Sequence, residues 1–325
     1  MNLKFLIRAD ANPTIGAGHI MRCLPLIEVL SSLKYEVEIL ASIEDLPWVD
    51  SALINTGARI HKSLETLMFD NSSEYILILD SYTLAEESPV IMSNRWKKVI
   101  VIGDSYTPNY ACDLFINMSF SPMVQRSKSR AKYFLSGPEY IMARNEIIEA
   151  KKIRNSRLLM TEKIIISGGA SDFGNFTHSI VKNIIKLDIS FSASIFSRYP
   201  PEYNYDSRFT FRSVGSSLVR DIEDASVFIS TAGTSAFDFL TLGGILGLGC
   251  AVENQTDNYL QLQANHLAIG IGKCDKYGVW ELSTENLRAL LVDKLLQETL
   301  IVNTKRLFNG NGAMKIAKEI LDLAL

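Results

Sequence analysis

The sequence is poor in the side chains from which metal and redox sites are built. Its four cysteines are too far apart for the C-x-x-C spacing of zinc and thiol–disulfide sites. The four histidines are equally dispersed, and no two of them have metal-ligand spacing. We therefore expect no metal site, no cofactor, and reduced thiols of the kind found in the cytoplasm. These residues are Cys23, Cys112, Cys250 and Cys274, and His19, His61, His178 and His266.

Long apolar runs and an excess of basic charge are also missing. The apolar stretch at the N-terminus is short and is soon followed by Arg8 and Asp10, unlike a signal peptide. No window approaches about 18 uninterrupted apolar residues, so we expect no membrane-spanning helix and a cytoplasmic location. A net charge of −3 and a pI near 5.9 argue against a nucleic-acid-binding protein, which needs a basic face. A small anionic ligand stays compatible, because a local pocket can be positive in an acidic protein.

What the sequence has in quantity is apolar residues in short, alternating blocks. With 325 residues, 47% of them hydrophobic, the chain is long enough for two domains with a core each. Continuous apolar strands, such as residues 76–79 and 99–102, indicate a sheet covered on both faces. Strands that alternate with helices predict a parallel, doubly wound α/β sheet. In the first half we expect strands at 4–8, 37–41, 75–80, 98–103 and 114–117, and helices at 18–33, 46–56 and 85–96.

This alternation stops once and then restarts. Residues 145–162 are charged and have the composition of a helix followed by a linker. We therefore predict two Rossmann-like domains facing across a cleft, an N-terminal one over 1–150 and a C-terminal one over 151–325. In the second half we expect strands at 163–167, 192–196, 209–212, 227–230 and 245–249, and helices at 176–187, 217–224, 234–242, 259–266, 284–296 and 313–323.

The segment between the first strand and the first helix carries a Gly-x-Gly-His run. Gly16 and Gly18 let the backbone approach a ligand closely. The start of the helix offers free N–H groups and a partial positive charge, which suit phosphate. His19 falls in the first helical turn, from which its ring can point into a cleft. The structural alternative is a tight turn and a histidine that only packs.

Charged residues flank this run. Asp10, His19 and Arg22 provide an acid, a titratable base and a cation within one short segment. This combination is typical of acid–base chemistry near neutral pH, where histidine changes its charge. The alternative is that Arg8 or Arg22 merely pairs with Asp10.

Three segments of the second half also follow buried strands. Residues 168–172 begin with a Gly-Gly pair, and their N–H groups and hydroxyl suit a pyrophosphate oxygen. Thr234 and Ser235 lie at a strand–helix junction, a geometry that favours anions. Residues 252–258 are dense in side chains that can read a sugar or a base edge. The alternatives are a plain turn and helices capped by Asn175, Thr234 or Ser235.

Taken together, these segments resemble the UDP-sugar hydrolases of the pseudaminic acid pathway. The run from Ile15 to Leu24, Ile-Gly-Ala-Gly-His-Ile-Met-Arg-Cys-Leu, is close to the family signature over its whole length. The resemblance spans nearly the whole chain and is stronger in the N-terminal half. Other matching stretches are Asp80-Ser81-Tyr82, Gly103-Asp104, Cys112-Asp113-Leu114, Gly137-Pro138-Glu139-Tyr140, Gly168-Gly169 and Glu253-Asn254-Gln255.

The resemblance implies a GT-B fold related to the MurG-type glycosyltransferases. It implies hydrolysis of UDP-2,4-diacetamido-2,4,6-trideoxy-β-L-altropyranose, by C–O cleavage with inversion at the anomeric carbon and without a metal. The N-terminal domain would hold the sugar and the C-terminal domain UDP. His19 would take a proton from the attacking water, and Tyr82 would be a second catalytic residue. The sugar would be bound by Arg8, Asp10, Gly16, Gly18, Arg22 and Asp80, and UDP by Gly168, Gly169, Ser171, Asp172, Thr234, Ser235, Asp238, Glu253, Asn254 and Gln255.

Departures from the family pattern keep other functions open. Relatives often carry Glu where this chain has the shorter Asp238, and their Leu-Gly-x-Pro run here reads Leu-Gly-Gly-Ile over 242–245. One alternative is a GT-B glycosyltransferase, which passes the sugar to a saccharide or lipid acceptor. Another is a non-catalytic nucleotide-sugar binder. The Gly-x-Gly-His run argues against the binder, because a binder has no use for a positioned base.

Overall fold

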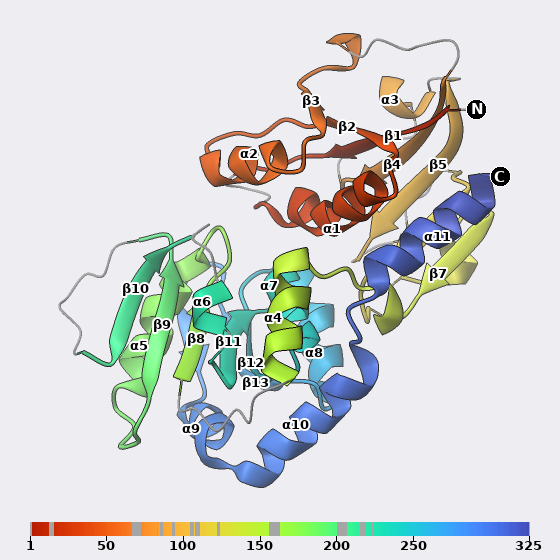
Figure 1. The fold of residues 1–325 in the computed structure, drawn as a ribbon. Coiled ribbons are helices and arrows are strands. Elements are labelled where there is room, and N and C mark those ends of the chain that lie inside the picture. The colour runs from red at the N-terminus through yellow and green to blue at the C-terminus, as the bar shows by residue number, and fades with distance from the viewer. Residues whose placement is uncertain are drawn as a thin grey trace. The chain divides into compact units, whose positions relative to one another are not determined.

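The chain divides into two compact units (Figure 1). The first unit joins Met1–Arg144 to Gly310–Leu325, and the second spans Asn145–Asn309. The chain's last helix therefore belongs to the first unit, although the expected division near residue 150 placed it in the second. The computed structural model describes residues 2–12, 16–66, 73–82, 84, 87–92, 95–104, 107, 111–121, 124–155, 163–199, 207–214, 219–222 and 224–324.

The described residues of the first unit form a seven-stranded parallel sheet in the order β3-β2-β1-β4-β5-β6-β7. The strand order reverses between β1 and β4, so the chain leaves these two neighbours toward opposite edges of the sheet. The strands are β1 (Asn2–Ala9), β2 (Glu36–Leu40), β3 (Arg59–His61), β4 (Ser73–Asp80), β5 (Trp96–Gly103), β6 (Leu114–Asn117) and β7 (Tyr133–Ser136). The helices are α1 (Gly18–Ser32), α2 (Pro47–Ile54), α3 (Pro89–Met92) and α11 (Gly312–Ala324), with short 3₁₀ turns η1 (Leu64–Thr66), η2 (Arg126–Lys128) and η3 (Pro138–Tyr140).

Helix α11 is held in the first unit by close packing. It contacts α1, β5 and η3, and its apolar face, which includes Ile316 and Ile320, is fully buried. Its first residue, Gly312, lies so close to the preceding chain that an added Cβ would overlap the carbonyl oxygen of Ile141. Lys315 adds an ion pair with Glu139 at 3.6 Å. A glycine at this contact therefore lets the end of the chain dock against the sheet.

The second unit repeats the layout with the strand order β10-β9-β8-β11-β12-β13-β14. Its described strands pair in parallel except for the hairpin of β13 and β14. The order reverses between β8 and β11. The strands are β8 (Lys163–Ser167), β9 (Ser192–Ser197), β10 (Phe209–Ser213), β11 (Val227–Thr231), β12 (Ile245–Cys250), β13 (Ile269–Cys274) and β14 (Trp280–Leu282). The helices are α4 (Asn145–Asn155), α5 (Phe176–Ile184), α6 (Val219–Ile222), α7 (Thr234–Thr241), α8 (Thr256–Ala264), α9 (Thr284–Val292) and α10 (Lys294–Leu307), with 3₁₀ turns η4 (Phe173–Asn175) and η5 (Glu253–Gln255).

Each sheet buries apolar side chains on its faces, as the continuous apolar strands predict. In the first unit Leu6, Leu79 and Phe115 pack with Val90 of α3. In the second unit, α5 and α9 bury their apolar stripes against β8, β11 and β12 in one cluster. The rings of Phe228 and Phe239 stack in the same unit with centroids 4.6 Å apart, between β11 and α7. The predicted class, two doubly wound α/β sheets, is confirmed.

Several local predictions were wrong. The short strands β3, β7, β13 and β14 were missed. The helix expected over 284–296 is two helices, because the Asp293 carboxylate accepts from the N–H of Leu296 and starts α10. Of the helix expected over 85–96, the described residues form only the short helix α3. Trp96 is instead the first residue of β5. Its indole donates to the carbonyl of Val90 at 2.5 Å and packs edge-on against Tyr75.

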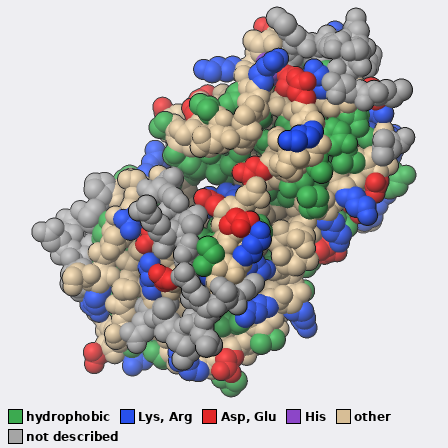
Figure 2. Space-filling view, in the orientation of Figure 1, with side chains coloured by type: hydrophobic (Ala, Val, Ile, Leu, Met, Phe, Trp, Pro, Cys, Tyr) green, Lys and Arg blue, Asp and Glu red, His purple; other side chains and the backbone are tan. Residues whose placement is uncertain are grey.

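The surface and the helices give two further observations. On the face drawn in Figure 2, basic and acidic side chains of the described residues are interspersed, as expected for a net charge of −3. Within the described part of the chain, every helix is too short or too polar to cross a membrane.

Replacement of Gly312 by Ala should loosen α11 and destabilise the protein. The added methyl group would overlap a backbone oxygen that cannot rotate away, and such overpacking costs about 1–3 kcal/mol of the free energy of unfolding. Thermal denaturation followed by circular dichroism measures the change. Met314→Ala is the control, since Met314 is half exposed on the same helix. Equal melting temperatures for both variants and the wild type would contradict the docking described here.

Candidate functional site

The candidate site of the first unit lies where its strand order reverses. In doubly wound sheets the loops after two such strands diverge and leave a crevice at the carboxyl ends of the strands. Asp80 is the last residue of β4 and pairs in register with Ala9 at the end of β1. Helix α1 begins shortly after β1, at Gly18. The fold thus brings the start of α1 to the carboxylate at the end of β4.

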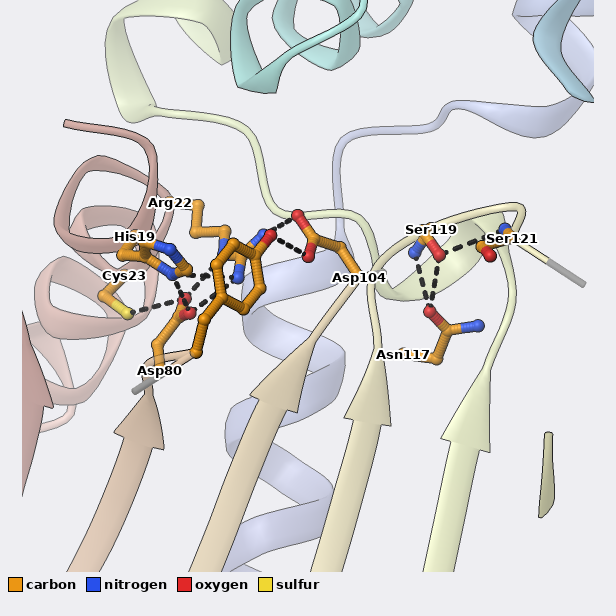
Figure 3. A network of polar contacts seen from close by, with 9 residues as sticks. His19, Arg22, Cys23, Asp80, Asp104, Asn117, Ser119 and Ser121 are labelled. Carbon is orange, nitrogen blue, oxygen red and sulfur yellow. Dashed lines mark hydrogen bonds and ion pairs between the residues drawn. The ribbon is translucent and has the colours of Figure 1, made fainter. Parts of the chain in front are cut away.

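Asp80 is the centre of a buried polar network (Figure 3). Its side chain is fully buried. The Nε of Arg22 donates to Oδ2 at 2.5 Å, and Nη2 donates to Oδ1 at 2.6 Å, which makes a bidentate pair. His19 Nδ1 lies 2.6 Å from Oδ1, and the thiol of Cys23 lies 3.6 Å from Oδ2. Three side chains of one helix therefore converge on one carboxylate of the neighbouring strand.

This geometry fixes the tautomer of His19. An ionised carboxylate only accepts hydrogen bonds, so Nδ1 carries the proton that Asp80 receives. In the neutral ring the lone pair is then on Nε2. Among the described residues, none makes a hydrogen bond to Nε2. The side chain is 7% exposed, so the ring is nearly immobilised while one nitrogen keeps its basic lone pair.

The charges in this network stabilise each other. Burial by itself raises the pKa of Asp80, but the Arg22 guanidinium and His19 together hold it below its ordinary value. Burial likewise lowers the pKa of Arg22, yet Asp104 and Asp80 raise it well above its ordinary value. Burial and the nearby Asp80 raise the pKa of the Cys23 thiol, which stays protonated. At neutral pH the site therefore contains a fixed carboxylate, a fixed guanidinium and a thiol.

Tyr82 and Asp104 extend the network toward solvent. The Nη1 of Arg22 donates to Oδ2 of Asp104, and the phenol of Tyr82 donates to Oδ1 of the same carboxylate. The rings of Tyr82 and His19 meet edge to face, with centroids 4.3 Å apart and an angle of 82° between their planes. Tyr82 is 36% exposed, whereas His19 and Arg22 are buried. The structure thus brings together His19, Arg22, Asp80 and Tyr82, four of the residues that the sequence singled out.

The other candidates in this segment lie apart from the network. Arg8 pairs with Asp10, as the structural alternative supposed, and also lies 3.4 Å from the carbonyl of Leu40. Asp10 in addition accepts from the N–H of Ser42 at 2.8 Å. Asp10 is therefore not the acid that serves His19 and Arg22. Gly16 has a positive φ of 76°, with open space where a side chain would be, and Gly18 is the first residue of α1.

In the second unit, glycine-rich loops meet where β8 and β11 end, which is again where the strand order reverses. A Cβ on Gly169 would lie 3.9 Å from Oγ1 of Thr231. A Cβ on Gly233 would lie 3.4 Å from the amide nitrogen of Gln255, whose side-chain oxygen accepts from the N–H of Ala251. The loops after β8, β11 and β12 are therefore neighbours, and the structure brings together the three segments that the sequence singled out.

Asp172 needs a correction. It was expected to bind UDP, but it is 1% exposed and its carboxylate is used inside the unit. Oδ1 accepts from the N–H of Thr177 at 3.1 Å, and Oδ2 accepts from the hydroxyls of Thr177 and Ser197 at 2.6 and 2.8 Å. A Cβ on Gly168 would overlap Oδ1. Asp172 therefore supports the Gly168–Gly169 loop from behind instead of facing a ligand.

The other residues of the second unit that were expected to bind UDP, or to cap a helix, differ in their exposure. Helix α7 has Gly233 as its N-cap, without a side-chain hydrogen bond, so neither Thr234 nor Ser235 caps it. Asn175 also makes no side-chain cap for α5, because Asp172 takes that role. Asp238 is buried in α7. By contrast, Ser171, Thr234 and Ser235 are half-buried and Glu253 and Asn254 are exposed.

Asp104 is a residue of this network that was not among the predicted site residues, although Gly103-Asp104 is one of the stretches that resemble the family. A signal was present, because Asp104 comes directly after a buried strand just as Asp80 ends the one before it. Asn117 ends the next strand, and its amide oxygen accepts from the N–H and hydroxyl of Ser119 at 3.0 and 2.8 Å (Figure 3).

In the described part of the chain, no three His, Cys, Asp or Glu side chains are grouped to hold a metal ion.

Comparison with known proteins gives one curated relative. The chain is 22% identical over 271 residues to the uncharacterized protein MJ1062 of Methanocaldococcus jannaschii. The matched part covers 74% of this chain and 54% of that protein, so the chain spans about half the length of the curated relative it matches. No family model matches the sequence.

Solved structures resemble the whole chain. MurG of Acinetobacter baumannii superposes with a TM-score of 0.63 at 11% identity, over 99% of this chain and 100% of that one. The UDP-GlcNAc 2-epimerase of Neisseria meningitidis, solved with UDP-GlcNAc bound, superposes with a TM-score of 0.63 at 12% identity, over 98% and 100%. These likenesses, together with the two doubly wound sheets, show that the chain has the GT-B fold.

Proposed function

We propose that this chain hydrolyses a UDP-activated diacetamido-trideoxy-hexose at its anomeric C–O bond, with inversion. UDP and the free sugar would be the products, and the sugar would serve the synthesis of a nonulosonic acid such as pseudaminic acid. The observation that carries the proposal is the contact of His19 Nδ1 with Asp80 at 2.6 Å, which leaves the basic lone pair on Nε2. The sequence resemblance around His19 supports the choice of substrate.

In the proposed reaction His19 acts as general base. Its Nε2 takes a proton from a water molecule, whose oxygen forms a bond to the anomeric carbon as the bond to the UDP oxygen breaks. The electron pair of that bond leaves with UDP. Asp80 keeps the imidazole in the required tautomer and stabilises the imidazolium that forms. The leaving group needs no strong general acid to protonate it, because UDP leaves readily when its charge is stabilised.

The second unit has features suited to UDP. The start of α7 and the glycine-rich loop after β8 present backbone N–H groups, and such groups favour a diphosphate. Gly168, Gly169, Ser171, Thr234 and Ser235 would bind the phosphates. Asp238 of α7, together with Glu253, Asn254 and Gln255 in the turn after β12, would bind the nucleoside. The bound UDP-GlcNAc in the Neisseria meningitidis enzyme of the same fold supports a nucleotide sugar as the ligand.

The first unit would hold the sugar near His19. Arg22, Asp80 and Tyr82 are adjacent to the base. Arg8 lies near the end of β1, Asp10 and Gly16 lie in the loop that follows, and Gly18 starts α1. The decisive experiment incubates the protein with UDP-2,4-diacetamido-2,4,6-trideoxy-β-L-altropyranose without any acceptor, and follows UDP release and the anomeric configuration by NMR. Release of the inverted free sugar supports the hydrolase. Binding without release points to a glycosyltransferase, and acceptors are then screened.

His19→Ala should lower kcat strongly. Loss of a general base lowers kcat by about 10²–10⁴-fold. Steady-state UDP release by the wild type and the variant measures this. His266→Asn is the control, because His266 is exposed and has a positive φ of 51°, which Asn tolerates. A folded His19→Ala protein with wild-type kcat would assign the base to another residue.

Asp80→Asn should lower kcat far more than it changes KM. The asparagine amide has one oxygen where the carboxylate has two. It therefore cannot accept from two nitrogens of Arg22 and also from Nδ1 of His19, so the ring loses its fixed tautomer. We expect a fall in kcat on the order of 10²-fold or more. The control is Asp113→Asn, which removes a carboxylate bonded to Lys132 and the N–H of Val99 at the opposite end of the sheet. If Asp80→Asn folds and turns over like Asp113→Asn, Asp80 does not serve the base.

A further inference from the structure

We propose that Asp104 fixes the direction of the hydrogen bonds of Tyr82, which we call its polarity. The phenol donates its proton to Asp104, so its oxygen accepts a hydrogen bond from a hydroxyl or amide N–H of the sugar. This inference rests on the proposed nucleotide-sugar function and specifies how its sugar is recognised. The feature that carries it is one carboxylate with two different donors. Oδ2 of Asp104 receives Arg22, and Oδ1 receives Tyr82.

The direction of both hydrogen bonds follows from charge. Arg22 is 6% exposed, and both carboxylates raise its pKa, so it can only donate. An ionised carboxylate can only accept. The phenol, which can do either, must therefore donate to Asp104. Its proton points into the protein, and toward a ligand it presents oxygen lone pairs.

The position of Tyr82 makes this polarity relevant to the substrate. Its ring lies against His19, the proposed base, at a centroid distance of 4.3 Å. Tyr82 is 36% exposed, and it is the most accessible of the network's side chains that flank the base. A sugar placed for attack beside His19 would then meet an acceptor at Tyr82. The substrate class that fits has a hydroxyl or an acylamino group at the facing carbon.

The same polarity means that Tyr82 does not protonate the leaving group. To do so it would have to break its hydrogen bond to a carboxylate that Arg22 holds in place. Tyr82 is in this view a residue that determines specificity, and Asp104 is a positioning residue that acts through it.

Asp104→Asn tests the polarity because it reverses it. Arg22 can only donate, so it retains the amide oxygen, and the amide NH₂ then faces Tyr82. The phenol must accept from that NH₂ and turn its own proton toward the ligand, where it meets the donor of the sugar. We therefore expect Asp104→Asn to be at least as damaging as Tyr82→Phe, which simply leaves the donor of the sugar unpaired.

The experiment is a double-mutant cycle of Tyr82→Phe and Asp104→Asn, with UDP-2,4-diacetamido-2,4,6-trideoxy-β-L-altropyranose as the probe. Tyr82→Phe should lower kcat/KM by about 5- to 100-fold, the range for one unpaired buried donor. Asp104→Asn should cause a similar or larger loss with Tyr82 present, and a loss of less than about threefold when Tyr82→Phe is already in place. Asp113→Asn controls for the loss of a half-buried carboxylate elsewhere in the sheet and should leave kcat/KM unchanged.

Each outcome decides the question. A large coupling between the two substitutions supports the polarity. If Asp104→Asn lowers kcat/KM equally in the wild type and in Tyr82→Phe, that would falsify the polarity, and the role of Asp104 would be structural only. The same cycle is measured on the Kd of the probe by calorimetry. Coupling in Kd without any turnover would uphold the polarity and reject the hydrolase. Turnover with additive losses would uphold the hydrolase and reject the polarity.

Discussion

The geometry of the candidate site in the first unit depends on the buried contact between Arg22 and Asp80. A fully buried carboxylate is tolerated only when its charge is paired and its oxygens are hydrogen-bonded. Asp80 meets this condition through two nitrogens of Arg22, which lies one helical turn after His19 on the same helix. The condition therefore sets the rotation of α1 over the end of β4, and with it the position of His19. Because desolvation offsets much of the attraction in such pairs, this one is better explained by positioning than by stability.

The two units present different groups where their strand order reverses. At the reversal point of the first sheet, charged side chains hold each other in place around one imidazole and one phenol. At the reversal point of the second sheet, the candidate groups are backbone N–H groups of glycine-rich turns and a helix start, which suit a diphosphate. Asp172 illustrates the difference, since its carboxylate shapes the loop through Thr177 and Ser197 and adds no negative charge where phosphate would bind.

Much of this arrangement was predictable from local pattern, and the rest depended on contacts between distant segments. Continuous apolar runs predicted the central strands, and the Gly-x-Gly-His run predicted the helix start that carries His19. Local pattern did not predict the carboxylate that contacts His19. Asp10 is closer in the sequence, but Asp80 is the partner, because β4 lies beside β1 and its last residue pairs with Ala9 at the end of β1. Asp10 is instead bonded to Arg8 and to the N–H of Ser42. The edge strands β3 and β7 and the docking of α11 through Gly312 likewise depend on tertiary packing, which composition does not encode.

Arg22 needs Asp104 as well as Asp80 because a buried guanidinium has more N–H donors than one carboxylate can accept. Its Nε and Nη2 donate to Asp80, and its Nη1 donates to Asp104. The second carboxylate thus gives the third nitrogen of Arg22 a partner. Because Asp104 also accepts from the phenol of Tyr82, the ion pair with Arg22 holds the carboxylate to which that phenol donates. The contacts that fix Arg22 beside His19 therefore also orient the phenol whose ring lies against His19.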